Sequence, residues 1–195
     1  MLPILTFDEG SLSPAYGYFF DRAWLAPHET IVAIAWKFAR MNALPGHLVV
    51  MQLARRTVDP YEGIPATATH VDVLALARSL KIPKRSLRDG IESPHGRRRM
   101  HDRLRFCTPC MELGYHGVMH QGVSATHCPC HRVALEERCR GCGSTTEYRL
   151  NAKLLNAPFR CASCRRPYAG WGRRLMHRRA PPELRLAITR SHCNA

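Results

Sequence analysis

Apolar positions at helical spacing predict a long helix in the first quarter of the chain. The segment 27–46 reads PHETIVAIAWKFARMNALPG. Pro27 suits a helix N-terminus, and the negative charge of Glu29 in the first turn suits the helix dipole. Pro45-Gly46 ends the pattern. The apolar face of this predicted helix consists of Ile31, Ile34, Ala35 and Phe38.

The other side of this predicted helix is polar. Lys37, Arg40 and Asn42 fall off the apolar stripe, and we expect them to be available for contact with a protein partner. A short helix over 47–55 and a loop over 57–69 are expected to follow.

A second periodic segment, 70–92, reads HVDVLALARSLKIPKRSLRDGIE and predicts two consecutive helices. We expect Thr69 or His70 near the cap of the first, an interruption at Pro83, and a second helix from Leu87 capped by Ser86. Helix, tight turn and short basic helix is the outline of a helix-turn-helix, and an ordinary helical hairpin with solvated charges fits equally well. The apolar face of the first helix is Val73, Leu76, Ala77 and Leu80, and the candidate nucleic-acid contacts of the second are Lys84, Arg85 and Arg88.

A basic segment with Pro and Gly at its start, SPHGRRRMHDRLR over 93–105, predicts a domain boundary. We therefore divide the chain into a helical domain over 1–96, a cysteine-rich domain over 97–170 and a basic tail over 171–195. The tail is interrupted by prolines, and a short helix after Pro182 or a mobile tail both fit it. Cys193 stands alone there and is expected to have no function.

Charge is distributed unevenly between the two halves. The formal net charge of +14 divides into +1 for residues 1–96 and +13 for residues 97–195. A polyanion is therefore the expected partner of the second half, and nucleic acid is the commonest one. Further candidate phosphate contacts are Arg97, Arg98, Arg99, Arg173 and Arg174.

The apolar content excludes a membrane-spanning chain. At 45% hydrophobic and 23% charged residues the composition is that of a folded protein, and no apolar run approaches the length of a span. The N-terminal residues MLPILTFDEG lack the features of a secretory signal, so we expect a cytoplasmic protein with reduced thiols.

The spacing of the cysteines predicts two structural zinc ions. Cys107-x2-Cys110 and Cys128-x2-His131 are 17 residues apart, and Cys139-x2-Cys142 and Cys161-x2-Cys164 are 18 residues apart. Pairs at this spacing match the zinc-ribbon pattern, with one thiolate replaced by imidazole. The expected fold class is a small zinc-stabilised α+β protein, in which a helical, helix-turn-helix-like domain precedes tandem zinc ribbons.

Other residues near these pairs are not expected to bind metal. Cys130 lies inside the second pair but breaks the two-residue rule. We expect His116, His120 and His127 to be polar residues on a hairpin loop. Eight donors fill two closed sites, and neither the zinc-deaminase nor the H-E-x-x-H signature is present, so we expect no enzyme.

The cysteine-rich segment resembles the zinc-binding region of the TniQ/TnsD family of transposition proteins. The helix at 27–46 is similar to the family's opening segment, through Glu29, Thr30, Ile31, Phe38, Ala39, Arg40 and Asn42. The chain departs from the family at Ala33-Ile34 in place of Ser-Trp, at Lys37 in place of Arg, and in the CTPC reading of the first pair. The matching zinc-region positions are Arg105, Cys107, Cys110, Gly114, Cys128, Pro129, His131, Leu135, Cys139, Cys142, Gly143, Cys161 and Cys164.

The resemblance implies a target-selection adaptor without catalytic activity. Such proteins connect DNA or a CRISPR RNA-guided complex to an AAA+ ATPase of the TnsC type, which recruits the transposase. A second copy of the chain, forming a homodimer, is a further candidate partner. A free-standing nucleic-acid-binding regulator with a zinc ribbon and a helix-turn-helix is the alternative that the residues leave open.

Overall fold

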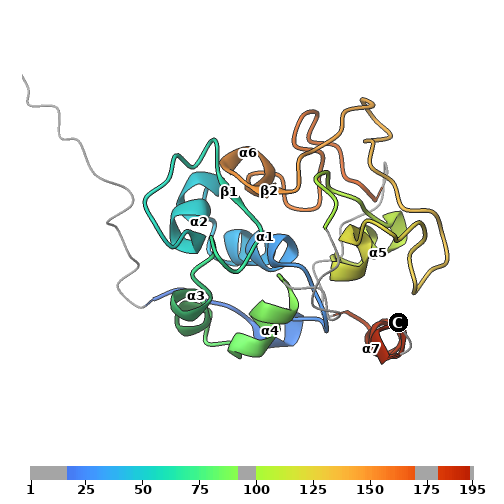
Figure 1. The fold of residues 1–195 in the computed structure, drawn as a ribbon, viewed down its shortest axis with the longest axis horizontal. Coiled ribbons are helices and arrows are strands. Elements are labelled where there is room, and N and C mark those ends of the chain that lie inside the picture. The colour runs from blue at the N-terminus through green and yellow to red at the C-terminus, as the bar shows by residue number, and fades with distance from the viewer. Residues whose placement is uncertain (1–16, 92–99, 170–179, 194–195) are drawn as a thin grey trace, which may run out of the picture.

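The computed structural model describes residues 17–91, 100–169 and 180–193, and it combines helices with short strands (Figure 1). The predicted mixture of helix and strand around two Cys/His clusters is confirmed at this level. Arg97, Arg98, Arg99, Arg173 and Arg174 lie outside the described residues. No helix among the described residues is both long and apolar enough to traverse a bilayer.

Helix α1 (Ile31–Met41) lies at the centre of the fold, with α2 (Gly46–Leu53) and α6 (Ala152–Leu155) packed against it (Figure 1). It begins later than the sequence predicts, because Thr30 is the N-cap and its hydroxyl accepts the Ala33 N–H at 3.3 Å. The predicted apolar face is buried, as is the rest of the helix from Ile31 to Ala39. A helix buried on all sides belongs to the core.

The predicted polar side of α1 is wrong for Lys37. Its ammonium group is buried, lies 2.5 Å from the Glu29 carboxylate and donates to the Trp24 carbonyl at 2.7 Å. Glu29 precedes the helix and is buried too. Asn42 exchanges two hydrogen bonds with the Phe19 backbone, whereas Arg40 is exposed as predicted. The short 3-10 helix η2 (Arg22–Trp24) lies in the segment that covers Lys37.

Helices α3 (Val73–Leu80) and α4 (Lys84–Asp89) form a hairpin at the lower edge of the molecule (Figure 1). The predicted apolar face of α3 is buried. Both predicted caps are wrong. The Asp72 carboxylate caps α3 by accepting two backbone N–H groups, and α4 begins directly after Pro83, which has the φ of a helix start. Lys81 ends α3 in the left-handed conformation, at φ 54°.

A two-stranded antiparallel sheet joins the first half of the chain to the second. Strand β1 (Ile64–Pro65) pairs with β2 (Arg149–Leu150) in the register Ile64 to Leu150. Nearby, the indole of Trp36 donates to the Leu154 carbonyl at 2.9 Å. Helix α2 starts at Gly46, where a Cβ would collide with the Ala152 carbonyl.

One hydrophobic cluster therefore includes residues from both predicted domains, among them Trp36 and Phe159, whose ring centroids are 4.9 Å apart. The division of the chain at residue 96 stays a prediction.

The remaining helices surround the first Cys/His cluster. They are α5 (Thr108–Glu112), the 3-10 helix η3 (Val118–Gln121) and α7 (Pro182–Cys193), so the C-terminal region contains the helix that the sequence left as one alternative. Leu184 and Ile188 of α7 are buried in the same small cluster as Ala26 and Tyr115. Arg185 donates to the Leu25 carbonyl at 2.8 Å, which secures α7 to the N-terminal part. The side chain of Cys193 lies outside the described part of the chain.

Candidate metal centres

The first centre brings together Cys107, Cys110, Cys128 and His131, whose donor atoms all lie within 4.8 Å of one another. The Cys110 and Cys128 sulfurs are 3.7 Å apart, and His131 Nδ1 lies 3.5 Å from the Cys107 sulfur. Zinc–sulfur bonds of about 2.3 Å in a tetrahedron require sulfurs about 3.8 Å apart, and a zinc–nitrogen bond requires S···N of about 3.6 Å. The donors of this cluster therefore have the spacing of a tetrahedral metal site.

The second centre consists of Cys139, Cys142, Cys161 and Cys164, again within 4.8 Å of one another. Its sulfurs are separated by 3.6 Å between Cys139 and Cys164 and by 3.7 Å between Cys142 and Cys161. Cys142 is exposed and Cys164 half-buried, whereas in the first centre the three cysteines are buried. Both clusters predicted from spacing can hold a metal ion.

Three of the four donor pairs use the same backbone turn. At Cys128, Cys139 and Cys161 the carbonyl accepts the N–H of the fourth residue on, and the N–H donates to the carbonyl of the fifth. That fourth residue has positive φ each time: 54° at Arg132, 72° at Gly143 and 63° at Arg165. A single β-bridge closes each turn. The turn aims both donors of a pair at one point.

The pair at Cys107 differs because Cys107 is the N-cap of α5 and Cys110 lies in its first turn. The long hairpins expected between the pairs are not confirmed in the described residues. The first interval contains α5 and η3, and the second contains β2 and α6. The short hairpins lie within the pairs, and the intervals fold onto the core.

Two thiols of the second cluster, Cys139 and Cys142, have altered acidity. Burial raises the pKa of Cys139 to about 12, whereas hydrogen bonds from Ser144 lower the pKa of Cys142 to about 6. Adjacent thiolates repel one another, so four can ionise together only when a cation compensates their charge. The sulfur-rich donor set thus suits a metal ion.

Two of the histidines expected on a polar loop, His116 and His120, lie in the core, so the prediction is wrong for them. His116 is fully buried; its Nδ1 lies 2.7 Å from the Thr30 hydroxyl and its Nε2 2.7 Å from the Arg105 carbonyl. Burial, with a contribution from His120, lowers the pKa of His116 to about 3, so the ring is neutral. His120 is also buried, whereas His127 is exposed as predicted. His116 therefore links the cap of α1 to the segment that enters the first centre.

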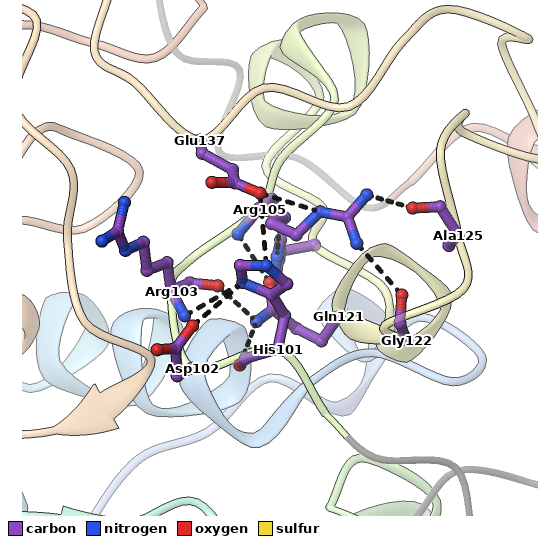
Figure 2. Close-up of polar contacts among 9 residues, drawn as sticks. His101, Asp102, Arg103, Arg105, Gln121, Gly122, Ala125 and Glu137 are labelled. Carbon is purple, nitrogen blue, oxygen red and sulfur yellow. Dashed lines mark hydrogen bonds and ion pairs between the residues drawn. The ribbon is translucent and has the colours of Figure 1, made fainter.

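The buried guanidinium of Arg105 holds the loop of the first centre in place (Figure 2). It donates to the carbonyls of Gly122, at 3.1 Å, and Ala125, and its Nε lies 3.6 Å from a Glu137 carboxylate oxygen. The Gln121 side chain accepts the Arg105 N–H at 2.7 Å. Sequence reasoning placed Arg105 in a motif but did not predict this role, because its partners lie in a loop far along the chain.

Of the candidate nucleic-acid contacts, the three that the structure describes lie on α4 and not at the metal centres. Lys84, Arg85 and Arg88 are exposed on α4, where Arg85 lies 3.8 Å from Asp89. A set of arginines around the second centre was missed: Arg138, Arg160, Arg165 and Arg166. Their position in the sequence, within two residues of the cysteines of that centre, could have identified them. No protein-family model and no curated protein matches the chain.

Proposed function

We propose that this protein is a zinc-stabilised, TniQ-like adaptor for DNA transposition, which links target DNA or a targeting complex to an AAA+ ATPase regulator of the transposase. The observation that carries the proposal is the pair of closed four-donor clusters within the TniQ/TnsD-like motif. Three thiolates with one imidazole, and four thiolates, are donor sets typical of structural zinc.

The role of the zinc ions in this proposal is to stabilise the fold. Four protein donors complete a tetrahedron and leave no position for a water molecule or a substrate. The turns that carry the donors contain little secondary structure, so metal binding contributes much of their folding energy. This arrangement supports the proposal that the protein acts by binding its partners.

An adaptor needs two contact surfaces in a constant relative orientation. The nearly neutral first half of the chain supplies the α3–α4 hairpin, on which Arg78, Lys81 and the partly exposed Leu74 are accessible. The basic second half supplies the nucleic-acid side. The sheet β1–β2 and the Trp36–Leu154 hydrogen bond join the two halves. Because Lys37 is buried, the ATPase contact is assigned to the hairpin and the first centre rather than to α1.

Co-purification tests the adaptor proposal. The tagged, zinc-loaded protein is incubated with the AAA+ ATPase encoded nearest to it, in the presence of ATP and duplex DNA. We expect the two proteins to elute together, and a variant with Leu74→Asp and Lys81→Glu on the hairpin to reduce that association. A wild-type chain that is folded and zinc-loaded but does not associate would refute the adaptor.

The exposed basic face of α4 favours one second candidate, a free-standing nucleic-acid-binding regulator. Lys84, Arg85 and Arg88 would then enter a groove of DNA as part of a helix-turn-helix. Duplex binding that is lost on substitution of these three residues, together with no ATPase association, is the result that distinguishes it.

A further inference from the structure

The two metal centres differ in their charge surroundings. Residues 106–135, from one residue before the first donor of the first centre to four residues after its last, contain one Lys or Arg, Arg132, and one acidic residue, Glu112. Residues 138–168, which span the second, contain seven Lys or Arg and one acidic residue, Glu147. The first centre is covered by α7, whereas the second reaches the surface at Cys142. A purely structural role for both sites would not require this contrast.

The turns of the second centre orient several of these arginines. Arg160 donates to the Arg165 carbonyl at 3.2 Å, and Arg166 donates across to the Gly141 carbonyl of the other pair at 3.2 Å. Arg138 lies 3.4 Å from the Gly143 carbonyl. Each such bond uses one of the five N–H donors of a guanidinium group and orients that group.

Arg140 does not belong to this group, because its guanidinium forms two bonds with the Glu136 carboxylate at 2.7 and 2.9 Å. We call Arg138, Arg160, Arg165 and Arg166 the arginine cluster.

Neutralising the thiolates does not account for the arginine cluster. The sulfurs of Cys139 and Cys161 accept backbone N–H groups, from Gly141 at 3.3 Å and from Ser163 at 3.4 Å. The guanidinium bonds just described go to carbonyl oxygens. Even against a zinc site of four thiolates, with a charge of about −2, four arginines leave a local excess of positive charge.

We propose that the arginine cluster around the second metal centre is the surface through which the protein contacts the phosphate backbone of duplex DNA. The inference rests on the proposed function and names the residues of its DNA-binding side. Guanidinium groups bind phosphate oxygens bidentately, and groups already oriented lose less side-chain entropy on binding. The contacts are to phosphate, so they provide affinity with little sequence preference.

The α3–α4 hairpin is a separate surface. Figure 1 shows α4 at the lower edge of the molecule and the loops of the second centre along the upper right. The arginine cluster and the hairpin therefore do not form one continuous DNA-binding face. This separation leaves the hairpin for the protein partner and makes the two surfaces testable independently.

A salt titration with matched variants tests the inference. Binding of a labelled duplex of about 20 base pairs is measured by fluorescence anisotropy between about 50 and 200 mM salt. The cluster variant carries Arg160→Gln, Arg165→Gln and Arg166→Gln; the control carries Lys84→Gln, Arg85→Gln and Arg88→Gln and loses the same charge. Zinc content and Tm are measured for both variants, and Arg138→Gln with Arg166→Gln provides a second cluster variant should the first lose metal.

We expect the cluster variant to lose affinity on the order of 100-fold and its log–log salt slope to become shallower by about 2 to 3, at about 0.9 per phosphate contact. The control should stay within about threefold of wild type. Equal losses in both variants, or an unchanged slope in a folded cluster variant, overturn the inference while the adaptor stands. A wild-type protein that binds no duplex overturns it too, and loss of ATPase association without loss of DNA binding assigns the cluster to a protein contact instead.

Discussion

Replacing Lys37 by methionine tests the buried ion pair at the centre of the fold. The side chains of Lys37 and Glu29 are 4% and 0% exposed, and their charged atoms are 2.5 Å apart. Lys37→Met leaves the Glu29 carboxylate buried without its partner, which costs about 3 to 5 kcal/mol. For a chain of this length that lowers Tm by roughly 6 to 20 °C. The assay is thermal unfolding monitored by circular dichroism at a constant zinc concentration.

The loss of unfolding free energy in Lys37→Met depends on pH, and it is larger at higher pH. Burial raises the pKa of Glu29, and Lys37 opposes that rise, so the pKa is higher still in Lys37→Met. An acid whose pKa is raised by folding binds more protons in the folded state, so stability falls as pH rises through the window above its unfolded pKa. As the pH is lowered from 8 to 6, the difference in free energy of unfolding between wild type and Lys37→Met should shrink by up to about 1.4 kcal/mol per pH unit.

A double variant provides the control. Glu29→Gln together with Lys37→Met removes both charges, and the amide oxygen can still accept the Ala26 N–H that Glu29 now accepts at 3.1 Å. We expect this variant to recover at least about 2 kcal/mol relative to Lys37→Met. Metal release on acidification affects all variants alike and cancels in the comparison. A Lys37→Met protein as stable as wild type at pH 8, or equally destabilised at every pH, would refute the reasoning.

Three further predictions concern the metal centres and the packing around them. Protein purified without chelator should contain two zinc ions by elemental analysis, and Cys161→Ser should lose one while Cys130→Ser keeps both; one ion or none in the wild type would show the pairing to be wrong. Gly46→Ala should lower Tm, because a Cβ there meets the Ala152 carbonyl; an unchanged Tm would mean that α2 and α6 can separate without cost. Ile188→Ala removes a buried contact between α7 and the first centre and should cost about 2 to 4 kcal/mol of local stability, seen as faster amide exchange in α7; exchange equal to wild type would contradict the packing.

The metal donors were predictable from the sequence because their geometry is local. A two-residue gap suffices for a turn that aims two donors at one point, and the three similar turns at Cys128, Cys139 and Cys161 need no distant contact. Gly143, a motif position, marks one of the residues with positive φ. The apolar faces of α1 and α3 were predictable for the same reason, since helical periodicity is a property of neighbouring residues.

Helix ends were less predictable because several residues compete for each cap. Thr69, His70 and Asp72 all precede α3, and the Asp72 carboxylate accepts its first N–H groups. Proline can occupy the start of a helix as well as interrupt one, so Pro83 precedes α4 directly and brings Lys84 into it.

The sequence by itself determined which residues can bind metal, where the main helices of the first half of the chain lie and which half of the chain is basic. Only the tertiary structure decided that Lys37 is buried against Glu29 and that His116 joins the core. Periodicity identifies one apolar face of a helix, but segments distant in sequence determine whether its other faces are covered. Here Trp24, Leu154 and Phe159 cover α1, and those contacts depend on the folding of the whole chain.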